Sequence, residues 1–272
     1  MVLNKINKAL QAFLITTASV IIVIGISFLE KSNNSSEFII GCPNSIGGMI
    51  TNFAVKYYCG ANIGIEEDPP ISAYLVADCC SPKTGISLTS GELQGAVMCP
   101  DSAKELVEKD DRFMIVSDFT FNTEIIVFSK SISSAEDVKK IGYMNGQERQ
   151  RKNLEALYGD KLNYIPIMAT SLPYALELGE VDAAVLDFGT GLQMDNDFIV
   201  LESDIPTTVL VIAKDFYGSE QYEALDAAIA EACKDLDNFE GFSEAMHFLS
   251  ADSIDGKEFE KWLSLDRRYP KK

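Results

Sequence analysis

The stretch FIIGCPNSIGGMITNFAVKYY, residues 38–58, decides the fold class. Its apolar opening, residues 38–42, predicts a buried strand, residues 43–45 form a polar break, and GGMITNFAVKYY predicts a helix that ends at Gly60. The same order of a short β-rich run and a helical pattern recurs along the chain. This alternation predicts an α/β protein whose mainly parallel sheets are flanked by helices.

Further strands are expected where apolar and β-branched residues cluster between polar breaks. They are ISAYLVADCC (71–80), LQGAVMC (93–99), RFMIVSDF (112–119), TEIIVFSK (123–130), KKIGYMN (139–145), LNYIPIM (162–168), VDAAVLDF (181–188) and TTVLVIAK (207–214). Two segments echo each other, SGELQGAV at 90–97 and LGEVDAAV at 178–185, each with a helix end, a Gly-Glu turn and a strand. The repeat indicates two similar α/β lobes.

Composition excludes several classes of protein. The 272 residues carry 23 Lys and Arg against 41 Asp and Glu, a net charge of −18, whereas a nucleic-acid-binding face needs positive charge. The single histidine, His247, cannot build a multi-histidine metal site and is expected to be an ordinary helix residue. No GxSxG, HExxH, GxGxxG, P-loop or CxxC motif occurs, so the chain is not expected to be an enzyme.

The N-terminal segment has the pattern of a membrane anchor. Lys5 and Lys8 precede an uncharged run of 21 residues, 9–29, which is longer than the apolar region of a cleavable leader and long enough to span a bilayer. Positive charge on its amino side predicts export of the rest of the chain. Residues 1–36 hold three positive charges and one negative, which leaves 20 positive against 40 negative, or −20, on the exported part.

Residues 38–237 resemble the substrate-binding components of ABC importers that have the type 2 periplasmic-binding-protein fold. The resemblance is to the branch that binds nitrate, sulfonates and thiamine precursors. It is carried by FIIGCPNSIGGM (38–49), by the paired GELQGAV (91–97) and GEVDAAVLDF (179–188), and by SISSAEDVKKIGYMNG (131–146). The last segment departs from the family's usual Leu-Lys-Gly-Lys by reading Val138-Lys139-Lys140.

The resemblance implies two lobes that close around a ligand. Residues 1–36 would be the signal anchor and linker, 37–121 and 207–272 the first lobe, and 122–206 the second, with chain crossings near 119–122 and 205–208. It also implies an ABC permease and its ATPase as partners, a small-molecule or metal ligand, no nucleic acid, and attachment to the membrane through the N-terminal helix. The binding module would then lie on the extracytoplasmic face.

In open parallel sheets, ligands bind beyond the carboxyl ends of the strands, where free helix N–H groups converge. The residues expected at those ends, and therefore at the ligand, are Cys42, Asn44, Ser45, Cys79, Cys80, Ser81, Met98, Cys99, Asp101, Met144, Asn145, Gly146, Thr170, Ser171, Asp187 and Phe188.

Four of the six cysteines belong to this set, and three explanations remain open. Cys42, Cys79, Cys80 and Cys99 could hold a soft ligand such as a mercury, copper(I) or arsenic species, or an organometal. They could instead form structural or redox disulfides, or end strands by coincidence as small apolar residues. The thiol-rich cleft also resembles family members with cysteine or selenocysteine that are associated with organometal uptake. Cys59 and Cys233 are expected in the core.

The leading hypothesis is therefore a membrane-anchored binding protein without a cofactor, whose transported ligand is a soft metal or organometal. The alternatives are a binding protein for a sulfonate, nitrate or thiamine-precursor-like molecule, a thiamine-pyrimidine-synthase-like enzyme on the same fold, and a thiol redox or metal-sensing module. Arg149 is expected to face solvent, and Phe188 to pack or to stack on a flat ligand.

Overall fold

The first of two five-stranded sheets contains the opening strand of the sequence, in the order β2-β1-β3-β10-β4. The strands are β1 (Phe38–Pro43), β2 (Ile71–Val76), β3 (Gly95–Met98), β4 (Phe113–Thr120) and β10 (Thr208–Ala213). β1 pairs in parallel with β2 and β3, while β10 runs antiparallel to both β3 and β4.

The second sheet has the order β7-β6-β8-β5-β9. It comprises β5 (Glu124–Phe128), β6 (Lys140–Met144), β7 (Asn163–Ile167), β8 (Ala183–Asp187) and β9 (Phe198–Val200). β6 pairs in parallel with β7 and β8, and β5 runs antiparallel to β8 and β9. Both sheets belong to one compact unit, Phe38–Lys272.

The expectation of mainly parallel sheets holds in part, because each sheet is mixed: β10 in the first sheet and β5 in the second run against the other strands. β5 follows β4 after only three residues, and β10 follows β9 without an intervening helix. A parallel strand needs a long crossover connection, usually a helix. The connections that lead into β5 and β10 contain no helix, and these two strands run antiparallel to their neighbours. Within each sheet the other four strands share one direction, as the alternating pattern predicts.

This computed structural model of the chain describes residues 37–59, 71–80, 82–132, 134–251, 253–265 and 269. The predicted anchor at 9–29 and Ser81 lie outside those residues. Within those residues, none of the helices combines the length and the apolar character that a bilayer span requires.

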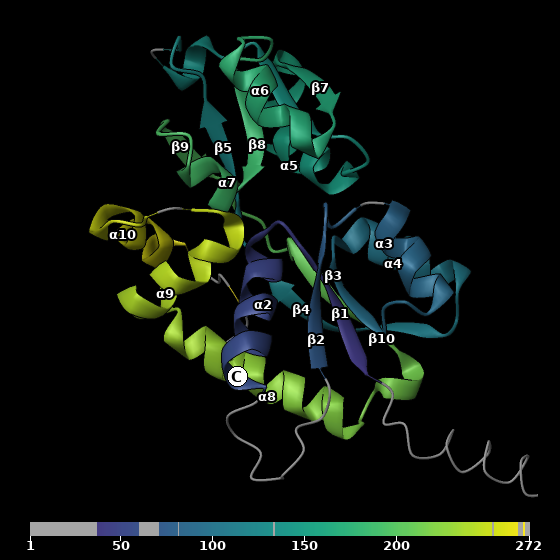
Figure 1. Cartoon of the computed structure of the whole chain (residues 1–272). Helices are drawn as coiled ribbons and strands as arrows, with labels where there is room; N and C mark the ends of the chain where they lie inside the picture. Colours follow the sequence, from purple (N-terminus) through teal and green to yellow (C-terminus); the bar gives the residue numbers. More distant parts are fainter. Residues whose placement is uncertain are drawn as a thin grey trace, which may run out of the picture. The chain divides into compact units, whose positions relative to one another are not determined.

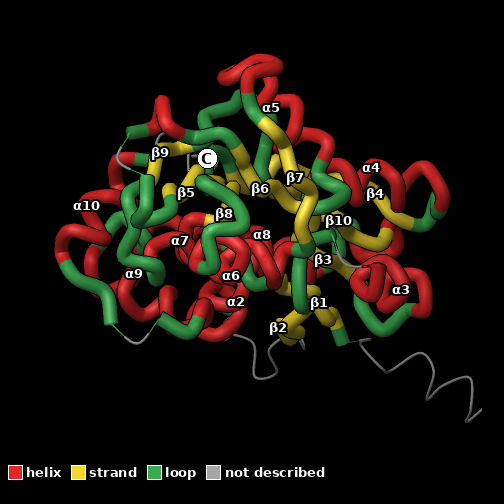
Figure 2. Tube along the Cα trace, turned by 90° about the horizontal axis from the view of Figure 1, so that it is seen from above, coloured by secondary structure: helices red, strands yellow, loops and turns green. Residues whose placement is uncertain are grey.

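Helices cover both faces of the first sheet (Figures 1 and 2). α2 (Ile46–Tyr58) and α8 (Glu220–Asp235) pack together on one face, and α3 (Pro82–Ser90) and α4 (Pro100–Lys109) lie on the other. Neighbouring strand residues divide between the two apolar clusters, as alternation along a strand requires: Val97 packs with the α2 side and Met98 with the α4 side.

The remaining helices are α5 (Glu148–Tyr158), α6 (Leu172–Glu177) and α7 (Phe188–Leu192), which follow strands of the second sheet, and α9 (Phe239–Met246) and α10 (Gly256–Ser264) near the C-terminus. Trp262 of α10 is fully buried, stacks on Phe242 with ring centroids 5.0 Å apart and contacts Phe188 at 5.9 Å. The C-terminal helices are thereby joined to the start of α7.

The two chain crossings between the sheets are tied by threonine hydroxyls. The Oγ1 of Thr120 lies 2.8 Å from that of Thr207 and 2.6 Å from that of Thr208, and the Oγ1 of Thr123 lies 2.7 Å from that of Thr207. All four residues are buried. Buried hydroxyls need such partners, and here the four partner one another where the chain passes from one sheet to the other. The lobe boundaries at 121/122 and 206/207 stay a prediction.

Candidate functional site

A cavity of about 330 Å³ lies between the two sheets. Asn44, Ser45 and Asp78 contribute from the end of the first sheet, and Met144 and Tyr174 are among those from the second. The acidic residues of its wall are Asp78, Glu124 and Asp187, and no lysine, arginine or histidine is among the described lining residues.

Three cysteine sulfurs gather beside this cavity. The Sγ atoms of Cys79, Cys80 and Cys99 all lie within 4.8 Å of one another, and those of Cys79 and Cys80 are 3.4 Å apart. Cys79 also lines the cavity. A metal ion at about 2.3 Å from three coplanar sulfurs would hold them about 4.0 Å apart. The spacing therefore fits a three-sulfur metal site, and thiolates select soft cations.

The sheet register explains why these three thiols meet. Cys79 and Cys80 follow β2, and Cys99 follows β3, and both strands run parallel to β1 between them. Their carboxyl ends therefore reach the same edge of the sheet. The main chain reinforces the contact, since the N–H of Cys99 donates to the carbonyl oxygen of Cys79 at 3.4 Å.

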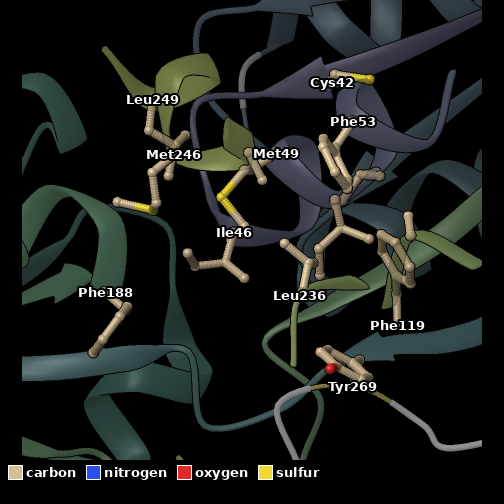
Figure 3. Close-up of a cluster of buried hydrophobic side chains, with 14 of the residues drawn as sticks. Cys42, Ile46, Met49, Phe53, Phe119, Phe188, Leu236, Met246, Leu249 and Tyr269 are labelled. Carbon is tan, nitrogen blue, oxygen red and sulfur yellow. The ribbon is translucent and has the colours of Figure 1, made fainter. Parts of the chain in front are cut away.

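Cys42 does not join the cluster, contrary to the predicted four-thiol set. It lies within β1 rather than beyond it, is fully buried in the apolar core (Figure 3), and its thiol donates to the carbonyl of Ile40 at 3.6 Å. Burial raises the pKa of the Cys42 thiol. Because strand side chains alternate between faces, Cys42 packs among the residues under α2 instead of reaching the strand ends.

The three sulfurs of the cluster differ in pKa. Hydrogen bonds from the thiols of Cys79 and Cys80 and from Ser102 lower the pKa of Cys99 to about 3, against the opposing effect of burial. Cys99 also caps α4, where its sulfur accepts the N–H of Ser102 at 3.4 Å and the helix dipole favours negative charge. The pKa of Cys79 is raised by its hydrogen bond to Cys80, by that to Cys99 and by burial. The hydrogen bond to Cys79 lowers the pKa of Cys80, but the hydrogen bond to Cys99 and burial raise it overall.

Gln147 completes the surroundings of the cluster, and no sequence pattern singled it out as a ligand-site residue. Its Nε2 lies 2.8 Å from the Sγ of Cys80, 4.0 Å from that of Cys79 and 3.8 Å from the Sδ of Met144. The side chain is buried, and its Oε1 has no hydrogen-bond partner among the described residues. Only the fold brings this residue, which precedes α5, to a thiol 67 positions earlier.

Asp187 joins helices from both sides of the cavity. Its Oδ2 accepts the N–H of Ile46 at the start of α2, and its Oδ1 accepts the N–H of Gly189 in α7, each at 3.0 Å. Burial raises the pKa of Asp187 to about 7, partly opposed by these two hydrogen bonds. The N-terminus of α2, where an anionic ligand would be expected, is therefore occupied by the protein's own carboxylate.

Arg149 is buried, and the prediction that it faces solvent is wrong. Its guanidinium makes two hydrogen bonds to Glu124, at 2.8 and 2.6 Å, and Gln150 donates to the same carboxylate at 2.9 Å. The pKa of Arg149 is raised because Glu124 outweighs the effect of burial. The backbone N–H of Arg149 donates to Asp101 at 3.2 Å. A helix pattern does not reveal a partner 25 residues away.

The other predicted site residues are divided between the cavity, the core and the surface. Asn44, Ser45, Met144 and Thr170 line the cavity. Asn145, Gly146 and Ser171 are exposed and do not line it. Met98 and Phe188 are core residues, and Phe188 packs edge-on against Phe198 instead of lining the cavity. His247 Nδ1 lies 3.0 Å from the carbonyl of Ala251, as expected of an ordinary helix residue.

The fold is that of known binding proteins of import systems. A zinc-bound ligand-binding component of an ABC-type import system from Staphylococcus aureus superposes with a TM-score of 0.58 at 15% identity, covering 83% of this chain and 82% of that one. The alkanesulfonate-binding protein from Xanthomonas axonopodis pv. citri, bound to MOPS, gives 0.61 at 13%, covering 86% and 85%. A methionine-bound nutrient-binding protein from Burkholderia cenocepacia gives 0.55 at 16%, covering 71% and 91%.

No protein-family model and no curated protein matches the sequence. The predicted fold, that of the substrate-binding components of ABC importers, is confirmed by the structural likeness.

Proposed function

We propose that this protein is the substrate-binding component of an ABC importer and that it captures a small, soft ligand between its two sheets. The observation that carries the proposal is the cluster of Cys79, Cys80 and Cys99, of which Cys79 lines the cavity. In this proposal residues 37–121 with 207–272 form one lobe and residues 122–206 the other. Closure of the lobes encloses the ligand.

A soft cation or its organic complex, such as a mercury, copper(I) or arsenic species, is the ligand that this chemistry favours. Three sulfurs within 4.8 Å suit such an ion, and one of them is already a thiolate at neutral pH because the pKa of Cys99 is lowered to about 3. The zinc held by the similar Staphylococcus aureus protein supports a metal as cargo on this fold. The cavity wall has three carboxyl groups, of which that of Glu124 is paired with Arg149, and no basic residue among its described members, which supports a cation or a neutral molecule.

A sulfonate, nitrate or carboxylate ligand is the weaker candidate. The similar proteins of known structure bind MOPS and methionine, so the fold accommodates such molecules. Against them stand Asp187 on the N-terminus of α2 and the acidic wall. An anion entering this cavity would lose its hydration without gaining a positive partner.

The remaining parts of the proposal concern catalysis, location and partners. The chain works without catalysing a reaction, on the extracytoplasmic face, anchored by residues 9–29. It delivers its ligand to an ABC permease that is driven by a cytoplasmic ATPase. The single histidine, His247, lies 3.0 Å from the Ala251 carbonyl and is not among the described residues that line the cavity.

The test is metal binding by the reduced full-length protein in detergent. Hg²⁺ and Cu(I) are titrated against a competing chelator, and metal-thiolate absorbance reports where the metal binds. Ethanesulfonate is the anionic comparison and methionine the zwitterionic one. Cys79→Ser, Cys80→Ser and Cys99→Ser should each weaken binding by at least about tenfold, because changing even a residue that only supports a metal ligand costs that much. Cys42→Ser is the matched control and should bind as the wild type does. Equal affinity in all four variants would exclude the thiol cluster as the binding site.

A further inference from the structure

Gln147 makes the contact between the thiol cluster and the second sheet. It follows β6 and precedes α5, whereas the cysteines follow strands of the first sheet. Its Nε2 donates to the Sγ of Cys80 at 2.8 Å and lies 4.0 Å from that of Cys79. Although Gln147 is the N-cap residue of α5, its side chain makes no capping hydrogen bond. The carboxamide is therefore directed at the sulfurs instead of at its own helix.

The position of this carboxamide is not explained by packing or by local hydrogen bonds. Gln147 is 1% exposed, and its Oε1 is buried without a partner among the described residues. A buried, unpaired carbonyl oxygen is destabilising, and native structures hold few of them. What the position supplies is an N–H donor beside three sulfur atoms, including the Sδ of Met144 at 3.8 Å.

We infer that Gln147 couples occupancy of the thiol cluster to closure of the second sheet onto the first. The inference rests on the proposed function, because it assumes that a metal ion binds at Cys79, Cys80 and Cys99. A metal-bound sulfur is a thiolate and acts only as an acceptor. A hydrogen bond to a charged acceptor is about twice as strong as one to a neutral group, so the Gln147 donor binds a metal-loaded cluster more tightly.

Other contacts join the two sides of the site without touching a sulfur. Ile46 donates to Asp187 at 3.0 Å, and Arg149 donates to Asp101 at 3.2 Å. Ser102 does donate to a cluster sulfur, that of Cys99, but it belongs to α4 of the first sheet and would not report closure. Among the hydrogen bonds of the described residues, the cluster is thus linked to the second sheet through Gln147.

Coupling of this kind is reciprocal. If the metal favours the closed arrangement through Gln147, the closed arrangement must favour the metal by the same factor. Gln147 also donates to Cys80 without metal, so its removal changes metal affinity by the difference between the two hydrogen bonds, about three- to tenfold. Removing the Gln147 donor should therefore weaken metal binding about three- to tenfold and also uncouple the segment 145–150 from metal loading.

The experiment uses the reduced full-length protein in detergent, with Hg²⁺ alone as the probe. Affinity is measured by chelator competition, and hydrogen–deuterium exchange of residues 145–150 is measured with and without Hg²⁺. Gln147→Leu removes both ends of the carboxamide. Gln147→Ala removes the side chain beyond Cβ and, with it, the N–H donor. Lys152→Ala, an exposed change on the same helix, is the matched control.

In the wild type and in Lys152→Ala, Hg²⁺ is expected to slow exchange in 145–150. Both Gln147 variants should keep the mercury-thiolate absorbance, bind Hg²⁺ about three- to tenfold more weakly and lose the slowing of exchange. Wild-type affinity and slowing in both Gln147 variants would overturn the inference while leaving the proposed function intact. Absence of mercury-thiolate absorbance in the wild type would overturn the proposed function, and the inference with it.

Discussion

Breaking the ion pair of Arg149 and Glu124 is expected to destabilise the protein far more than breaking a second ion pair on the same helix. The side chain of Arg149 is 3% exposed and that of Glu124 10%. Arg151, two residues along, pairs with Glu155 at 2.9 Å, but those side chains are 48% and 38% exposed. The two pairs share a helix and differ in burial, so they form a matched comparison.

The difference in burial sets the magnitudes. Arg149→Met leaves the buried carboxylate of Glu124 with Gln150 as its remaining hydrogen-bond donor, and removing one partner of a buried pair costs roughly 3–5 kcal/mol of unfolding free energy. Arg151→Met removes an exposed i,i+4 pair, which contributes about 0.3–0.5 kcal/mol. At roughly 2–4 °C per kcal/mol, Arg149→Met should lower Tm by about 6–20 °C, and Arg151→Met by about 2 °C or less.

The assay is unfolding of the reduced protein by urea, which gives the free energy of unfolding, and by heat, which gives Tm. The double variant Arg149→Met/Glu124→Gln should be more stable than Arg149→Met alone, because the unpaired buried charge is then gone. The reasoning is refuted if Arg149→Met costs less than about 1 kcal/mol, or if the double variant is no better than the single one.

Three further predictions concern individual groups. Because the pKa of Asp187 is raised to about 7, above its unfolded value of about 4, the folded protein binds this proton more tightly. The free energy of unfolding of the wild type, relative to that of Asp187→Asn, should therefore fall as pH rises between about 4 and 7. The same pH dependence of stability in both proteins would contradict this. Because the pKa of Cys99 is lowered to about 3, the reduced metal-free wild type should show thiolate absorbance at about pH 6 that Cys99→Ser lacks, and equal spectra would exclude the thiolate. A Cβ at Gly48 would lie 1.8 Å from the carbonyl oxygen of Pro43, so Gly48→Ala should lower Tm strongly, whereas Gly85→Ala, with open space around it, should raise stability by about 0.5–1 kcal/mol. Equal melting of the two alanine variants would show that the start of α2 is not tightly packed.

The alternation of apolar runs and helical patterns was enough to predict the α/β class and the strands that carry the site. Those features are local, because hydrophobic periodicity and polar breaks act over a few residues. The placement of Cys79, Cys80 and Cys99 at one sheet edge was also predictable, since parallel strands bring their carboxyl ends together. The direction of β5 and β10 was not, because a strand's orientation depends on its connections through space.

The sequence by itself thus determined where the strands end and that cysteines occur at those ends. Only the tertiary structure decided which thiols meet: Cys42 lies within its strand and packs under α2, while the other three lie beyond theirs. It likewise decided that Gln147 reaches the cluster and that Arg149 is buried against Glu124. Such contacts join residues far apart in the chain, and their geometry depends on packing between sheets, which no local pattern encodes.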